Sequence, residues 1–436
     1  MEIINVVGGG LAGCEAAHYL AKRGFKVRLF EMKPKKFSPV HKLDTLCELV
    51  CSNSLKAERL DSAGGLLKKE MELFGSIICE CAQYTRVPAG GALAVDRELF
   101  SKKVTEVIEN NPNIEIINEE VTDINGDEIT ILAPGPLVSD ALAETISDIT
   151  DGYLNFFDAV APILTLESVD MSRAFFGARY GRGTDDYINC PLTREEYDAF
   201  YDALITAEGA PLHDGVENPK VFEGCMPVEV MAKRGRDTLT FGPLKPVGIY
   251  DPKTGKRPYA VVQLRQDNKE GTLFNMVGFQ TNLKWGEQKR VFSMIPALKN
   301  AEFVRYGVMH RNSFINSSVL LNHDFSLKAN RNIFFAGQIT GVEGYVESAA
   351  SGIMAAMGAA ARAHGKECGC LTHLSIMGAL SAYISGGSVG KFQPMNANFG
   401  ILPPLDTRIK DKKERYTRLA ERSLSALSLQ IENGEI

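Results

Sequence analysis

The first 31 residues contain the pattern that most constrains how this chain folds. A β-branched run at residues 3–7 is followed by a glycine-rich turn at 8–13, a helix-forming stretch at 14–23 and a second strand-like run at 26–30, which ends at Glu31. A strand, a glycine turn, a helix and an acid about 20 residues later form the fingerprint of a dinucleotide-binding βαβ unit. The sequence therefore predicts an α/β fold with a Rossmann-like domain.

The residues of the turn have distinct expected roles. Gly8 permits the tight turn, Gly10 lets backbone amides approach a pyrophosphate, and Gly13 allows close packing of helix on strand. A carboxylate at the end of the second strand accepts hydrogen bonds from ribose hydroxyls and disfavours a 2′-phosphate, so we expect FAD or NAD and not NADP. The expected cofactor-binding residues here are Gly8, Gly9, Gly10, Leu11, Ala12, Gly13 and Glu31.

A second glycine-rich segment, near the other end of the chain, favours FAD over NAD. Residues 332–336 have the pattern of a buried strand, residues 337–344 form a glycine-rich loop, and residues 348–363 form a helix of small residues. The N-terminus of such a helix stabilises negative charge on a ligand, including the anionic edge of a reduced flavin. We therefore expect Gly337 and Gln338 to contact FAD. Close packing of the helix on a sheet is the alternative explanation for its small residues.

A nucleotide-binding fold built from both chain ends implies an insertion between them. Residues 173–298 contain many short β-like runs, turns and charges, which indicate an inserted α+β substrate domain. The predicted FAD-binding domain then consists of residues 1–172 and 299–436, and its second part carries a basic C-terminal helix.

Composition narrows the function classes. The chain of 436 residues has 48 Lys and Arg against 54 Asp and Glu, a formal net charge of −6, which argues against wholesale coating of nucleic acid. The start of the chain lacks a basic export signal, and no apolar run approaches the roughly 18 residues of a membrane span. We expect a cytoplasmic protein with free thiols and no membrane partner.

Two basic clusters nevertheless stand out. Residues 220–257 contain 8 basic and 4 acidic side chains, and a predicted helix at 406–422 contains 7 and 4. Each cluster alone is more often a solvated face, but two in an acidic chain favour a phosphate-rich partner. The candidate phosphate-binding residues are Lys233, Arg234, Arg236, Lys412, Lys413 and Arg415.

Two of the nine cysteines have sequence contexts that suit a reactive, catalytic thiol. Cys225 lies in a Gly/Pro bend among basic residues, and nearby positive charge increases the thiolate fraction of a thiol. Cys51 lies in a polar turn after the first βαβ unit, within expected reach of a flavin ring. A buried core thiol is the alternative reading of each. The C-x-C pairs at 79/81 and 368/370 lack the usual zinc spacing, so no metal site is expected.

Five segments together carry a resemblance to a known family. They are VGGGLAGCEAA (7–17), CSNS (51–54), FEGCMP (222–227), AKRGRD (232–237) and FAGQITGVEGY (335–345). Over nearly its whole length the chain resembles the folate- and FAD-dependent tRNA (uracil-5-)-methyltransferase family. The glycine segments are shared with a larger flavoprotein family that modifies wobble uridines, whereas the two cysteine contexts are specific to the methyltransferase family.

The resemblance implies methylation of carbon 5 of uridine 54 in the T-loop of tRNA. It also implies methylenetetrahydrofolate as carbon donor, reduced FAD as reductant, NADH or NADPH to reduce the FAD, and no DNA partner. Cys225 resembles the thiol that adds to the uracil ring, and Cys51 the family's second catalytic cysteine. The alternatives are a wobble-uridine-modifying tRNA flavoprotein, a small-molecule FAD/NAD(P)H oxidoreductase, and a noncatalytic flavin-bearing RNA chaperone or redox sensor.

Overall fold

The N-terminal βαβ pattern forms the centre of a parallel sheet. β1 (Ile3–Val7) pairs with β2 (Lys26–Phe30), and α1 (Leu11–Lys22) connects them. The sheet order is β16–β7–β1–β2–β6, and every pair in it is parallel. Its edge strand β16 (Ile333–Phe335) comes from the C-terminal part of the chain. The prediction of a Rossmann-like α/β fold assembled from both chain ends is confirmed.

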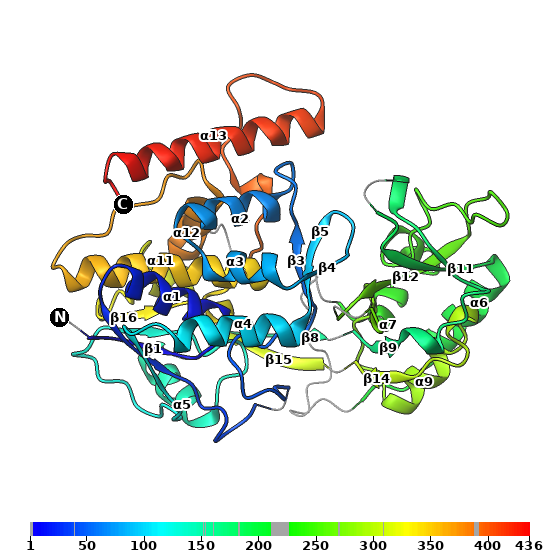
Figure 1. Cartoon of the computed structure of the whole chain (residues 1–436), viewed down its shortest axis with the longest axis horizontal. Helices are drawn as coiled ribbons and strands as arrows, with labels where there is room; N and C mark the ends of the chain where they lie inside the picture. The colour runs from blue at the N-terminus through cyan, green and yellow to red at the C-terminus, as the bar shows by residue number, and fades with distance from the viewer. Residues whose placement is uncertain are drawn as a thin grey trace.

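The computed structural model describes residues 3–38, 40–150, 152, 154–159, 161–181, 184–210, 226–268, 271–307, 309–387 and 392–436. Figure 1 shows two parts side by side. We call the part around the parallel sheet the first lobe, and the part formed by residues 161–307 the second lobe. Each has its own core of buried apolar side chains.

The remaining elements of the first lobe surround the parallel sheet (Figure 1). A small antiparallel sheet has the order β3–β5–β4. Its strands are β3 (Ser54–Ala57), β4 (Arg86–Val87) and β5 (Ala92–Val95). The parallel sheet itself also contains β6 (Ile114–Ile117) and β7 (Thr130–Leu132). The helices are α2 (Ala63–Leu73), α3 (Ile77–Tyr84), α4 (Arg97–Glu109), α5 (Asp140–Thr150), α10 (Ser317–Leu320), α11 (Tyr345–Ala363), α12 (Ile376–Ala382) and α13 (Lys412–Glu432).

The second lobe is built on an antiparallel six-stranded sheet of order β10–β11–β12–β13–β9–β14. Among the described residues of this lobe, four α-helices accompany the sheet, which agrees with the predicted α+β character. The strands are β9 (Ile163–Thr165), β10 (Phe175–Phe176), β11 (Tyr187–Leu192), β12 (Ala260–Gln266), β13 (Leu273–Met276) and β14 (Phe303–Arg305). The helices are α6 (Arg194–Ile205), α7 (Val228–Ala232), α8 (Thr238–Phe241) and α9 (Trp285–Phe292).

Two paired strands connect the lobes. The chain leaves the first lobe on β8 (Leu154–Ala159) and returns on β15 (Met309–Phe314), which are antiparallel partners. The second sheet includes β9 and β14, which lie just outside the expected insertion limits of 173 and 298. The exact domain division therefore stays a prediction.

Local capping explains where several helices begin. Asp96 caps α4 by accepting a hydrogen bond from the Leu99 N–H at 2.9 Å. Asp411 caps α13 by accepting one from the Glu414 N–H at 2.7 Å. The expected C-terminal helix at 406–422 is therefore wrong in its bounds, because Asp411 and not Asp406 is the N-cap. Within the described part of the chain, no helix is both long and apolar enough to cross a membrane.

Candidate functional site

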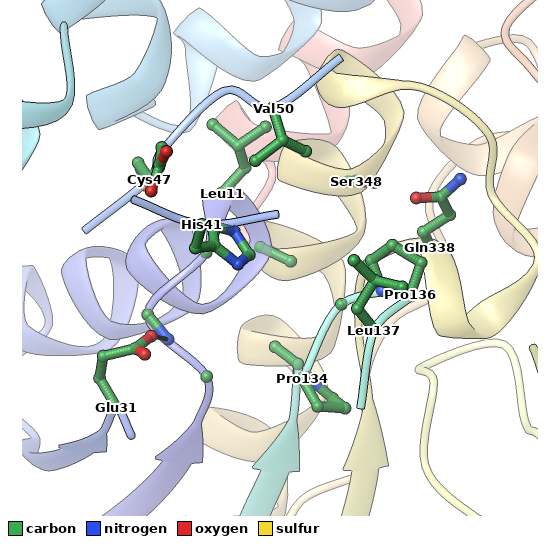
Figure 2. A pocket seen from close by; sticks show the side chains of 18 of the residues that line it. Leu11, Glu31, His41, Cys47, Val50, Pro134, Pro136, Leu137, Gln338 and Ser348 are labelled. Atoms are coloured by element: carbon green, nitrogen blue, oxygen red, sulfur yellow. Dashed lines mark hydrogen bonds between the residues drawn. The ribbon is translucent and has the colours of Figure 1, made fainter. Parts of the chain in front are cut away.

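A cavity of about 360 Å³ lies at the carboxyl ends of the parallel strands, where open α/β sheets bind their ligands. Both glycine-rich segments open into it, and Figure 2 shows side chains from widely separated parts of the chain around the same space. The lining includes all the predicted cofactor-binding residues except Gly13, namely Gly8, Gly9, Gly10, Leu11, Ala12, Glu31, Gly337 and Gln338.

The first glycine turn is shaped by close backbone approaches. Gly8 has a φ of +106°, and a Cβ placed there would lie 2.2 Å from the carbonyl oxygen of Ala133. A Cβ at Gly13 would lie 1.8 Å from the Gly8 oxygen, so only glycine lets α1 pack this closely on the turn. At Gly10, by contrast, a Cβ would meet no atom within 4 Å. That side of the turn is open to a ligand.

Glu31 is buried at the end of β2 and holds the turn in place. Its carboxylate accepts hydrogen bonds from the Gly9 N–H at 2.9 Å and the Lys33 N–H at 3.0 Å. A carboxylate has about four lone-pair sites, so acceptor capacity remains for ribose hydroxyls. The same side chain can therefore order the turn and recognise a ribose.

The second glycine segment brings another helix N-terminus to the cavity. A Cβ at Gly352 in α11 would lie 2.1 Å from the Ala12 oxygen in α1, so the two helices are in close contact. Their N-caps, Gly10 and Gly344, provide no side-chain hydrogen bond to the first turn. Two uncapped helix N-termini beside one cavity suit the phosphates of a dinucleotide. The close packing that was the alternative reading of the small residues is also present.

The cavity suits a dinucleotide such as FAD because it extends from Glu31, at the expected ribose position, to Tyr345 and Cys51. A cavity this long offers contacts for both ends of a dinucleotide. Lys56 also lines it and forms an ion pair with Glu347, a fully buried carboxylate in the first turn of α11. This ion pair was not predicted, and no local sequence pattern indicates it.

Two cysteines line the cavity, but their surroundings differ. Cys47 is 2% exposed, and burial raises the pKa of its thiol well above the usual value, which opposes thiolate formation. Cys51 is only partly buried. Of these two thiols, Cys51 is the one that a reagent or substrate in the cavity can contact.

The loop that carries Cys51 is held by both lobes. The Tyr345 hydroxyl accepts hydrogen bonds from the N–H groups of Cys51 at 2.7 Å and Ser52 at 3.2 Å. From the second lobe, Arg265 donates to the Ser52 hydroxyl at 2.7 Å and to the Asn53 side-chain oxygen at 3.1 Å. These contacts fix the loop at the junction of the lobes. Nothing in the local sequence around Arg265 signals this role.

A second arginine supports the same loop. Arg97, the first residue of α4, donates to the Leu49 carbonyl at 3.1 Å and forms an ion pair with Asp267 at 2.9 Å. Both members of this pair are largely buried, with side chains 11% and 6% exposed. Truncating one partner would leave a buried charge unpaired, which is strongly destabilising. The Arg97–Asp267 pair was not predicted.

Cys225, the other expected catalytic thiol, lies outside the described residues. The described chain resumes one position later, and the Val228 N–H donates a hydrogen bond to the Gln280 carbonyl at 2.7 Å. Gln280 lines the cavity although it belongs to the second lobe. The position of the Cys225 thiol stays a prediction.

The two sets of candidate tRNA-binding residues lie on different lobes. Lys233, Arg234 and Arg236 follow α7, and all three are exposed. The guanidinium of Arg236 is already engaged, since it pairs with Asp198 at 2.8 Å and with Asp202 of α6.

The C-terminal candidates lie at the start of α13 in the first lobe. They are Lys412, Lys413 and Arg415. Lys412 and Arg415 both lie over the Tyr416 ring, at 5.5 and 5.4 Å from its centroid. The contribution of either set to tRNA binding stays a prediction.

Comparisons with known proteins identify relatives of this chain. The family model described as glucose inhibited division protein A matches residues 3–367. Two relatives carry the name methylenetetrahydrofolate--tRNA-(uracil-5-)-methyltransferase TrmFO. The protein from Acetivibrio thermocellus is 61% identical over 98% of both chains, and that from Pelotomaculum thermopropionicum is 57% identical over 97% of both.

Solved structures agree with the fold. Two crystal forms of Aquifex aeolicus GidA match with TM-scores of 0.71 and 0.72 at 18% identity, over 100% of this chain and 74% and 76% of that protein. At this identity the likeness supports the fold alone. The full-length matches above, however, show that the chain belongs to the TrmFO family of methylenetetrahydrofolate--tRNA-(uracil-5-)-methyltransferases, within the wider glucose-inhibited division protein A family.

Proposed function

We propose that this protein is a folate- and FAD-dependent methyltransferase that acts on carbon 5 of a uracil in tRNA. The uridine is residue 54 of the T-loop, methylenetetrahydrofolate is the carbon donor, and NADH or NADPH keeps the flavin reduced. The names of full-length relatives at 57–61% identity support the reaction class. A tRNA substrate would place the protein in the cytoplasm, and no DNA partner is required.

The observation that carries the proposal is the position of Cys51. Its thiol lines the same cavity as both glycine segments and Glu31, so a nucleotide cofactor and a reactive sulfur can meet there. Bound FAD, once reduced, supplies the two electrons that convert a transferred methylene into a methyl group. In this proposal, Glu31 holds a ribose and the first turns of α1 and α11 stabilise the phosphates.

The uracil itself needs activation, because its carbon 5 is a poor nucleophile. A thiolate that bonds to carbon 6 makes carbon 5 nucleophilic, and the bond breaks again after methyl transfer. We assign this role to Cys225. Val228, three positions after Cys225 in the sequence, donates a hydrogen bond to the carbonyl of cavity-lining Gln280, which supports this assignment.

Cys51 would then act on the proton of carbon 5, or protect the one-carbon unit from water. Its loop is fixed by Tyr345 and Arg265, which would hold the sulfur steady relative to the substrate. The target base is normally tucked inside the folded T-loop, so it must be extruded before it reaches this cavity.

The test is incubation of the flavin-loaded protein with unmodified tRNA, methylenetetrahydrofolate and NADH, followed by nucleoside analysis. We expect 5-methyluridine at position 54, and none without folate. Cys225→Ala should abolish the product while the protein stays yellow. Cys370→Ala, which removes an exposed thiol outside the cavity, should remain active. A fully active Cys225→Ala variant would remove the proposed nucleophile.

A further inference from the structure

The edge of the second sheet carries a surface that the proposed chemistry leaves unused. β14 is the last strand in the sheet order, Arg305 ends it, and Tyr306 follows. Trp285, the first residue of α9, stacks on Tyr306 with ring centroids 5.7 Å apart and planes inclined by 14°. We call Trp285, Arg305 and Tyr306 the β14 surface. Figure 1 shows β14 and α9 together on the side of the second lobe near the lobe junction.

Arg305 is a half-buried cation that forms no direct ion pair with any described residue. It also donates no side-chain hydrogen bond to any residue within the described ranges. Burial lowers its pKa, and the neighbouring positive charge of Arg97 lowers it further. The carboxylate of Asp267 acts in the opposite direction and raises the pKa of Arg305, but this carboxylate is already paired with Arg97 at 2.9 Å. A guanidinium in this setting is costly unless an anion binds to it.

The aromatic part of the surface points to a planar ligand. Trp285 is the single tryptophan of the chain, yet 64% of it is exposed. Tyr306 also stacks on Phe303, at 5.6 Å and 29°, so the indole rests on an ordered aromatic pair. An exposed, supported aromatic face is the usual stacking platform for an unpaired nucleobase.

The charge around the surface distinguishes RNA from a small folate ligand. Residues 284–306 contain five basic and two acidic side chains, an excess that the whole chain does not share. Lys284 pairs with Glu208 and Arg290 with Glu287, so the remaining basic side chains carry this excess. Trp285 does not line the cavity, so its exposed face is available to a ligand that extends beyond the cavity. Arg305, in contrast, lies close enough to Cys51 and Tyr345 to interact with them electrostatically. A polyanion that carries bases and reaches the cavity fits the positive charge, the exposed indole and the position of Arg305 near Cys51.

We propose that the β14 surface binds tRNA, with Arg305 on a backbone phosphate next to the reacting uridine and Trp285 stacked on a neighbouring unpaired base. The inference rests on the proposed function, because tRNA is the substrate named there. It adds a contact surface that neither sequence-predicted basic cluster contains.

The single tryptophan makes the stacking directly measurable. Acrylamide should quench the fluorescence of Trp285 in the free, flavin-loaded protein, because the indole is exposed. Addition of unmodified tRNA should protect it, whereas methylenetetrahydrofolate alone should not. Protection by the folate and none by tRNA would overturn the inference and identify the occupant as folate.

Two variants separate phosphate contact from stacking. Arg305→Gln should reduce the slope of log affinity against log salt by about 0.7–0.9, the value for one lost phosphate contact. Trp285→Ala should weaken tRNA binding by about tenfold with the slope unchanged. Trp285→Leu, which keeps apolar contact with Tyr306, should behave in the same way and replaces the alanine variant if that one misfolds.

The matched control is Lys366→Gln. This exposed lysine lies beyond the C-terminal end of α11, about 28 Å along the helix from the cavity, and its replacement should leave binding and slope unchanged. The Arg305 and Trp285 variants could have normal flavin content and yet bind tRNA with unchanged affinity and salt slope. If the wild-type protein methylates tRNA, that result would refute tRNA binding by the β14 surface and leave the proposed function intact. A wild-type protein that forms no 5-methyluridine would instead refute the proposed function.

Discussion

The phenol oxygen of Tyr345 accepts hydrogen bonds from the backbone N–H groups of Cys51 and Ser52, although nearly 300 positions separate them in the chain. This contact ties the N-terminus of α11 to the loop that carries the partly buried thiol of Cys51. Burial of the hydroxyl raises the pKa of Tyr345 far above its usual value, so it remains a neutral phenol. Its ring also lines the cavity.

Replacing Tyr345 by phenylalanine should loosen this loop. The change keeps the ring and removes the acceptor of two hydrogen bonds, which together contribute about 1–2 kcal/mol to the free energy of unfolding. We expect that loss in urea unfolding of the flavin-loaded protein, together with weaker FAD binding. The control Tyr383→Phe removes a hydroxyl that donates to Gln393 at an exposed site, and should not affect FAD affinity. Equal FAD affinity in both variants would contradict the role of Tyr345.

Thiol reactivity should distinguish the two cysteines of the cavity. We expect iodoacetamide to modify Cys51 in flavin-free protein and to leave Cys47 largely unmodified, because Cys47 is buried and its thiol pKa is raised. Bound FAD should slow the modification of Cys51, since the cofactor would occupy the same cavity. Peptide mass spectrometry reports each site separately. Identical rates at Cys51 with and without FAD would show that the flavin does not cover this thiol.

Glu31→Gln should weaken FAD binding by about tenfold. The amide keeps the size of the side chain but loses the charge and one acceptor, and hydrogen bonds to a charged group are worth about 1.5–3 kcal/mol. Fluorescence titration of apoprotein with FAD measures the effect. Glu119 also lines the cavity, but its side chain is 65% exposed and lies 3.9 Å from Lys35, so Glu119→Gln is the matched control. Similar affinities of the two variants would exclude a specific role for Glu31.

Glu70 should make stability depend on pH. Its carboxylate accepts hydrogen bonds from the Ile376 and Met377 N–H groups and the Ser423 hydroxyl, but burial dominates and raises its pKa from 4.5 to about 7. The folded state therefore binds more protons than the unfolded state between these values. Stability should fall as pH rises through this window, by at most about 3 kcal/mol from this group.

The measurement is urea unfolding of the wild-type protein and the Glu70→Gln variant at several pH values from 4.5 to 8. Glutamine does not titrate, so the variant should lose less stability than the wild-type protein over this range. The same pH dependence in both proteins would mean that the pKa of Glu70 is not raised in the folded state.

Several features could be read from the sequence because they depend on neighbours in the chain. The βαβ unit, Glu31 and the second glycine loop with α11 follow from short-range periodicity and turn chemistry, and the structure contains all of them where expected. The start of α13 shows the limit of this reasoning. Asp406 and Asp411 are both acceptable caps by residue type, and only the folded backbone selects Asp411.

Tertiary structure alone decided which side chains meet around the cavity and at the lobe junction. The contacts Tyr345–Cys51 and Arg265–Asn53 join positions more than 200 residues apart. Arg236 appears free in the sequence but is paired with Asp198 and Asp202 of α6, whereas Arg305 appears ordinary and forms no direct ion pair with any described residue. The physical reason is that burial, and the pairing of a charge, depend on the packing of distant elements and leave no trace in the local pattern of residues.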